Sequence, residues 1–354
     1  MSSFKRKGSV KQAPVYPGTR PSPATPLTLI TSTGIPSLDD ILGGGLPLSC
    51  SLLIAAPDLH SSYGDLVQKY SIAQGLSCGH RVCVVDENAE AFVKDIMWLP
   101  RSRQGATTEL TVDEDEDKPR PQDDQKIKIA WRYEQMKPFQ TTVSASSYST
   151  DDYCHNFDLT SRVPEAIVGD SLRSGQLSFI DTHPSSPGRT STSEILRRIV
   201  DLLGPETPEP LSAAPPLRIC IPSLGSPHWG ELTHQDILYF LHSLRAILRR
   251  HPHVCASLSL APPVATPSWG GSGWVQKLGW VTDAALTLSA FSADPSLTAL
   301  FPNHHGLVQI HTLPAPHTIL PPSDKFSTLR GLSAASGSTG AGKTTSRSSA
   351  LGNA

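Results

Sequence analysis

SLDDILGGGLPLSCSLLIAAPDLHSSYGDLVQKY, residues 37–70, is the stretch that decides the fold. Its first residues predict a short helix with Ser37 as N-cap, because a serine oxygen accepts hydrogen bonds from the free N–H groups of a first helical turn. The run Gly43–Gly45 is expected to end that helix. An apolar strand at 51–55, a loop and a helix at 65–76 follow. Strand, turn and helix in this order is the arrangement in which phosphate-binding loops hold nucleotides.

The loop after this strand has the position of a phosphate-binding loop but lacks its chemistry. Such a loop reads G-x-x-x-x-G-K-[ST], because glycines let backbone N–H groups surround the phosphates and the lysine neutralises their charge. Here Ala56 and Pro57 stand where glycines are needed, and a proline has no N–H to donate. Ser61 and Ser62 end the loop without a lysine. We therefore expect a degenerate phosphate loop, with no cofactor, no metal and no catalytic residues.

Apolar strands alternate with helices along the rest of the chain. This alternation predicts an α/β fold, with a mostly parallel sheet covered by helices on both faces. The last three strands alternate apolar and polar residues, so they are expected at an edge or in antiparallel pairs. The expected strands are 81–87, 176–181, 216–224, 253–262, 283–291 and 306–314, and the expected helices include 192–204.

The helix with the clearest signals is expected at 233–251. Thr233 and Asp236 resemble a capping box, in which each side chain binds the backbone of the other residue. Four leucines at helical spacing predict its buried face: Leu238, Leu241, Leu244 and Leu248.

A second match to the phosphate-binding pattern lies near the C-terminus, in GSTGAGKTT at 337–345. Gly337, Gly342, Lys343 and Thr344 occupy every required position. However, no apolar strand precedes them, and the Ser/Gly-rich residues that follow are too few for a stable helix. We interpret this match as a chance product of a Gly/Ser-rich tail.

Composition divides the 354 residues into a folded body and polar ends. Residues 1–27 are basic and Pro/Ser-rich, so we expect a disordered tail before a domain at 28–330. An acid-rich stretch at about 101–125 predicts a flexible insertion in that domain, and 331–354 predicts a disordered Gly/Ser-rich tail. The formal net charge of −2 gives no basic field that would indicate nucleic-acid binding. With no signal peptide and no apolar run long enough for a bilayer, we expect a soluble protein that contacts no membrane.

Several separate motifs resemble the PAXNEB family of Elongator complex subunits. They include IAWRYEQM, YCHNFDLT, ICIPSLGSPHWG and LPAPHTILPPSDKFSTLRGL, and the resemblance extends over about residues 14–332. After STLRGLS the chain departs from the family pattern, which continues into a terminal strand. We expect a truncated or altered C-terminus there.

The resemblance implies a RecA-like ATPase fold that has lost its phosphate-binding lysine. It implies a heterohexameric ring with Elongator proteins 5 and 6, which binds tRNA and joins the Elongator catalytic subcomplex. That complex modifies the wobble uridine (U34) of tRNA, and the reaction chemistry belongs to another subunit. A cytoplasmic and nuclear location follows from the same resemblance.

Three hypotheses about activity stay open. In the first, the chain is a non-catalytic ring subunit, and Lys126, Lys128 and Arg132 contact tRNA phosphates, although the same cations also fit an ordinary solvated surface. In the second, it is an active ATPase of the KaiC/RecA type. In the third, it is a regulator that binds proteins but no nucleic acid. Nucleotide binding separates the first two, and salt-sensitive tRNA binding separates the first from the third.

Overall fold

The computed structural model describes residues 16–23, 28–100, 153–183, 191–204 and 215–316, and its centre is a seven-stranded sheet. Every neighbouring pair is parallel except β11 and β12, so the predicted mostly parallel sheet is confirmed. The order across the sheet is β12 (Gly306–Thr312), β11 (Ala284–Ala290), β4 (Ser51–Ala55), β10 (Val254–Leu260), β9 (Leu217–Leu224), β5 (Arg81–Val85) and β8 (Leu177–Ile180).

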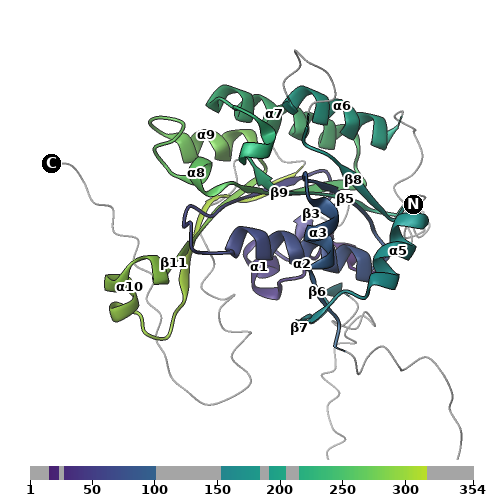
Figure 1. Cartoon of the computed structure of the whole chain (residues 1–354), viewed down its shortest axis with the longest axis horizontal. Helices are drawn as coiled ribbons and strands as arrows, with labels where there is room; N and C mark the ends of the chain where they lie inside the picture. Colours follow the sequence, from purple (N-terminus) through teal and green to yellow (C-terminus); the bar gives the residue numbers. More distant parts are fainter. Residues whose placement is uncertain (1–15, 24–27, 101–152, 184–190, 205–214, 317–354) are drawn as a thin grey trace, which may run out of the picture.

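Helices cover both faces of this sheet, as the alternating pattern predicted (Figure 1). On one side lie α6 (Ser191–Leu203), α7 (His234–Arg250), α8 (Pro262–Ala265) and α9 (Trp274–Val281). On the other lie α1 (Pro36–Ile41), α2 (Tyr63–Ser77) and α3 (Ala89–Lys94), with α5 (Glu165–Arg173) packed against α3 and β8. The remaining elements are short: β1 (Thr19–Pro21), β2 (Leu29–Thr31), β3 (Leu46–Pro47), β6 (Met97–Trp98), β7 (Asp158–Arg162), η2 (Pro227–Trp229), η3 (Phe291–Ala293) and α10 (Pro295–Leu300).

Strand β9 contacts the helices on both faces of the sheet. Leu217, Ile219 and Ile221 belong to the apolar core beneath α6 and α7. Successive side chains of a strand point to opposite faces, so Arg218 and Cys220 lie toward α2. The α7 side of the sheet is therefore apolar along β9, whereas the α2 side carries a buried cation.

The connection from β4 to β5 places the candidate loop. Helix α2 joins these strands, although β10 and β9 lie between them in the sheet. In open α/β sheets, a crevice forms where the connections after two neighbouring strands go to opposite faces of the sheet. Ligands bind in this crevice, at the carboxyl ends of the strands. The loop between β4 and α2 lies at this edge, as the sequence predicted.

Helix α7 confirms its sequence signals. Thr233 is the N-cap and forms a capping box with Asp236. Ile237, Phe240, Leu241, Leu244 and Leu248 are buried, while Leu238 is only partly buried. The predicted apolar face is thus confirmed except at Leu238.

The prediction for β10 was wrong in one respect. It is neither an edge strand nor antiparallel, but lies between β4 and β9 and is parallel to both. Its alternation arises because Ser257 and Ser259 are buried on the α2 side of the sheet, whereas Leu258 and Leu260 enter the core beneath α7. Small hydroxyl side chains fit under α2, so the alternation reflects two buried faces rather than one exposed face.

Two N-terminal predictions also need correction. The first helix starts at Pro36 with Ile35 as N-cap, because a proline preset at φ near −65° suits the first helical position. Ser37 is therefore inside the helix and is not its cap. Residues 16–23, which we expected within a disordered tail, contain β1, and β1 pairs antiparallel with β2.

Candidate functional site

The loop of residues 56–62 joins β4 to α2 at the carboxyl edge of the sheet. Ala56 is buried, and Pro57 is half-buried. Ser61 lies beside Asp58, whose carbonyl accepts a hydrogen bond from the Ser61 N–H at 3.1 Å. Ser62 precedes the first residue of α2 and is exposed. The loop has the strand–turn–helix setting of a phosphate site but contains no lysine, arginine or glycine.

A β-hairpin holds this loop through its own polar groups. The carboxylate of Asp58 accepts a hydrogen bond from the Ala290 N–H at 2.6 Å, at the end of β11. The Tyr63 hydroxyl donates to the His305 carbonyl at 3.1 Å, just before β12. The loop and the first residue of α2 are thus held by contacts to the β11–β12 hairpin.

Two further carboxylates lie close to each other at this edge of the sheet. Asp65 lies in the first turn of α2, and Asp86 follows β5. Burial raises the pKa of Asp65, with the Asp86 charge adding to the rise and Lys69 opposing it. Burial likewise raises the pKa of Asp86, and its neighbours Glu87 and Asp181 add to that effect. Together with Asp58, these groups make the carboxyl edge of the sheet acidic, which is unfavourable for a triphosphate.

Two histidine side chains lie against these carboxylates. The His228 imidazole, on η2 after β9, contacts the Glu87 carboxylate directly. His183 Nδ1 lies 3.4 Å from the Asp181 carboxylate and 3.9 Å from that of Glu87. Within the described part of the chain, no group of three or more His, Cys, Asp or Glu side chains could hold a metal ion. We interpret the cluster as contacts between imidazole and carboxylate side chains.

Strand β9 brings no acid to this edge. Its residues, Leu217–Leu224, include no Asp or Glu. The Pro222 carbonyl near its end accepts a hydrogen bond from the Ser259 hydroxyl of β10. The end of β9 is therefore occupied by a bond within the sheet.

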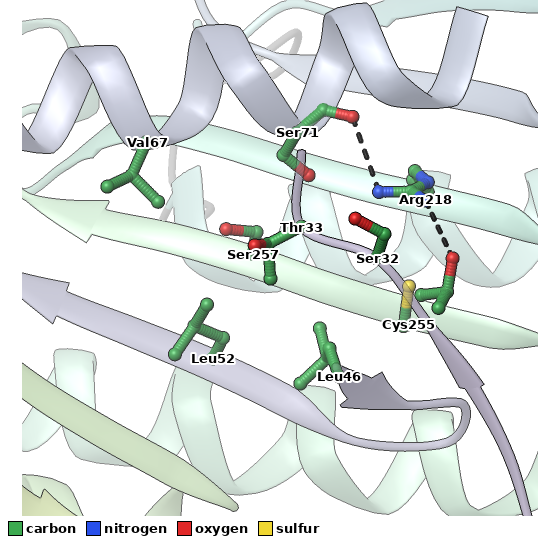
Figure 2. A pocket seen from close by; sticks show the side chains of 10 residues that line it. Ser32, Thr33, Leu46, Leu52, Val67, Ser71, Arg218, Cys255 and Ser257 are labelled. Carbon is green, nitrogen blue, oxygen red and sulfur yellow. Dashed lines mark hydrogen bonds between the residues drawn. The ribbon is translucent and has the colours of Figure 1, made fainter. Parts of the chain in front are cut away.

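A buried polar network lies under α2, away from the loop (Figure 2). The guanidinium of Arg218, 2% exposed, donates from Nε to His80 Nδ1 at 3.0 Å and from Nη2 to the Thr31 hydroxyl at 2.6 Å. Its third bond goes to the Ser71 carbonyl at 3.4 Å. His80 Nε2 is 2.7 Å from the Pro17 carbonyl, so the acceptor role of Nδ1 makes Nε2–H the donor.

The Arg218 cation also acts through its charge on a nearby buried carboxylate, that of Asp39. The Asp39 carboxylate accepts hydrogen bonds from the Ser32 hydroxyl at 2.6 Å and the Thr33 N–H at 2.7 Å. Burial raises the Asp39 pKa, while those bonds and the Arg218 charge oppose the rise. Burial and the charge of Arg218 lower the pKa of His80 to about 3, so its ring stays neutral and can accept from the guanidinium.

This network was not predicted from the sequence, although one signal in the sequence indicates it. Arg218 interrupts the apolar run LRICIPSL, which was predicted to be a buried strand. A charged residue in such a strand needs buried partners. Those partners, His80 and Thr31, are 138 and 187 residues away, so nothing local identifies them.

Of the other predicted site residues, none lies among the described residues. Gly337, Gly342, Lys343 and Thr344 of the tail motif fall outside them, as do Lys126, Lys128 and Arg132. The acidic stretch 101–125 falls outside as well. Among the described residues, no helix combines the length and apolarity needed to cross a membrane.

The sheet and its two helical layers define an α/β protein of the RecA-like class. The chain belongs to the PAXNEB family, whose model matches residues 12–329. It is similar to Elongator complex protein 4 of Xenopus laevis, with 28% identity over 347 residues that cover 90% of this chain and 80% of that protein. The human protein of the same name is 28% identical over 317 residues, 84% of this chain and 72% of its own length. That of Schizosaccharomyces pombe is 26% identical over 324 residues, 88% and 83% of the two chains.

Proposed function

We propose that this chain is a non-catalytic subunit of the Elongator complex. In this proposal it forms a heterohexameric RecA-like ring with Elongator proteins 5 and 6. The ring binds tRNA and supports modification of the wobble uridine by the catalytic subcomplex. Family membership supports the first part, since the relatives reported above carry the name Elongator complex protein 4.

The observation that carries the non-catalytic part is the position of the Asp58 carboxylate. It lies in the loop where a nucleotide's phosphates would be held, and it accepts a hydrogen bond from Ala290. Nucleotide binding there would bring phosphate charge close to a carboxylate, with no lysine in the loop to offset it. Asp65 and Asp86 extend the negative charge beyond the loop.

Assembly through protein contacts is supported by apolar side chains near the same hairpin. Leu300 on α10 is 70% exposed, and Phe301 after it is 45% exposed. On β12, Leu307 and Val308 are also exposed. In Figure 1, α10 and the end of β11 project away from the helical layers. We expect this hairpin surface to contact a neighbouring RecA-like subunit, because clustered exposed apolar side chains mark interaction sites.

Purification from the host tests assembly directly. The tagged chain should bring down two other RecA-like proteins in equal amounts, in a particle with the mass of a hexamer. A variant with Leu300→Asp and Phe301→Asp should lose these companions, because two charges would be buried in the contact. The control Leu172→Asp, on α5 and 38% exposed, should keep them. A chain that purifies alone under the same conditions contradicts the proposal.

The tRNA part predicts a specific salt dependence. RNA contacts should lie away from the acidic carboxyl edge, because Asp86, Glu87 and Asp181 would repel phosphates. The assembled ring should bind tRNA, and the logarithm of its binding constant should fall linearly as the logarithm of the salt concentration rises. Replacing Lys126, Lys128 and Arg132 with glutamine should reduce that slope. An affinity insensitive to salt, or no affinity, would favour a regulator that binds proteins alone.

A further inference from the structure

A small cavity lies under α2, beside the buried network of Arg218. It is enclosed by α2, by the strands β4, β9 and β10, and by the segment Thr31–Thr33, and has a volume of about 10 Å³. Figure 2 shows hydroxyl side chains from three of these parts around it: Ser71 of α2, Ser257 of β10, and Ser32 with Thr33. This is about the space that one water molecule needs.

Ser257 supplies the observation that points to an occupant. Its side chain is 5% exposed, and its hydroxyl has no hydrogen-bond partner among the described residues. Ser259, two residues further on the same face of β10, does have one, because its hydroxyl donates to the Pro222 carbonyl. A buried hydroxyl without a partner destabilises a fold, and such groups in native proteins are commonly satisfied by ordered water.

The other walls can complete the coordination of a water molecule. Arg218 uses three of the five N–H donors of its guanidinium in bonds to His80, Thr31 and Ser71. One N–H on each Nη therefore has no partner among the described residues. The wall also includes apolar Leu46, Leu52 and Val67, which exclude bulk solvent from the space. A water molecule here would have several polar neighbours.

We propose that this cavity is a binding site for one ordered water molecule, which hydrogen-bonds the Ser257 hydroxyl and links β10 to the polar groups of α2 and Thr31–Thr33. The bound water partly hydrates the Arg218 cation in the interior. It also completes the polar contact that joins the N-terminal strands to the main sheet. Arg218 and the water together hold these segments.

The sign of the stability change in Ser257→Ala tests this site. If the water is bound, the variant removes one of its partners, and the melting temperature of the full chain falls by roughly 2–4 °C. If the cavity is dry, the variant removes an unsatisfied hydroxyl, so the melting temperature stays the same or rises. Ser259→Ala is the matched control, since it loses a direct hydrogen bond and must fall in both cases.

A structure determined at high resolution gives a second, independent test. We expect a density peak for water within hydrogen-bond distance of the Ser257 Oγ atom in the unmodified chain. A well-ordered cavity with no peak, or a melting temperature that does not fall in Ser257→Ala while it falls in Ser259→Ala, overturns the proposal.

Discussion

The two ends of α2 are held in different ways. At its N-terminal end the loop of residues 56–62 is partly exposed and is bordered by carboxylates. The bonds of Asp58 and Tyr63 tie this end to the hairpin. In its C-terminal half, the buried Gln74 donates to the Tyr153 carbonyl at 2.9 Å and accepts from the His155 N–H at 3.0 Å. There the helix also receives the bond of Arg218 at the Ser71 carbonyl.

This difference shows which contacts stabilise the helix. The end that would hold a nucleotide lacks the groups to do so. The other half is held by contacts with distant parts of the chain, namely residues 153–155, which precede β7, and Arg218 of β9. The position of α2 therefore depends on contacts within the chain and does not require a bound ligand. Such a helix suits a protein that works by assembly.

Of the substitutions considered, the removal of Arg218 should lower the free energy of unfolding most. In Arg218→Ala, the groups that it binds at His80, Thr31 and Ser71 lose their donor, and a cavity remains. The free energy of unfolding should fall by about 3–5 kcal/mol in urea titrations. The control Arg173→Ala removes an exposed ion pair with Asp170 and should change it by less than about 1 kcal/mol. Equal effects of the two variants would contradict the importance of the buried network.

Acid should also weaken the buried network under the C-terminal half of α2. Burial and Arg218 lower the pKa of His80 from 6.5 to about 3, so below pH 6.5 the unfolded chain binds a proton that the folded chain does not. Its contribution to stability is complete above pH 6.5 and is lost as the pH falls toward 3, at up to about 1.4 kcal/mol per pH unit. His80→Asn keeps an acceptor for Arg218 but cannot titrate, so its unfolding free energy should fall less steeply with acid. Parallel curves for both proteins would show that His80 does not titrate in this way.

A pair of glycines tests how closely the N-terminal segment packs on α2. Gly34 has φ of +86°, and a Cβ there would lie 2.8 Å from the Tyr70 carbonyl oxygen. Gly79 has φ of +72° with no atom within 4 Å of such a Cβ. Gly79→Ala should therefore cost about 1 kcal/mol for backbone strain alone, and Gly34→Ala about 2–4 kcal/mol, both measured by urea unfolding. Similar costs at the two positions would mean that the close approach to α2 is relaxed in solution.

Substitutions in the loop before α2 should change the stability least. Asp58→Ala leaves the Ala290 N–H without its acceptor and should cost about 1 kcal/mol, with faster hydrogen exchange at the Ala290 amide. Asp58→Asn keeps an acceptor oxygen and should preserve slow exchange. If both variants exchange like the unmodified chain, the carboxylate does not hold the hairpin.

Local patterns in the sequence predicted much of the fold. The strand at 51–55 coincides with β4, and the capping box at Thr233 is present, because both depend on neighbouring residues. The absence of a lysine from the loop at 56–62 can be read from the sequence alone, and its interpretation as a degenerate phosphate loop stays a prediction. Ser37 failed as a cap because Pro36 offered a better helix start.

The buried half of the candidate site could not be predicted in the same way. The bond from Arg218 to Thr31 joins residues 187 apart on strands of two different sheets, so only tertiary packing brings them together. The place of β10 inside the sheet was missed for a related reason: the burial of Ser257 and Ser259 depends on α2, which no short window of sequence contains. Tertiary contacts decided both features.

Nucleotide titration of the purified full chain tests the central claim most directly. We predict no saturable binding of ATP up to about 1 mM, either by the unmodified chain or by Lys343→Ala. Saturable binding that Lys343→Ala abolishes would establish the tail motif as a nucleotide site, and binding that survives this change would point to the loop at 56–62. Either form of binding would contradict a non-catalytic subunit that works by assembly.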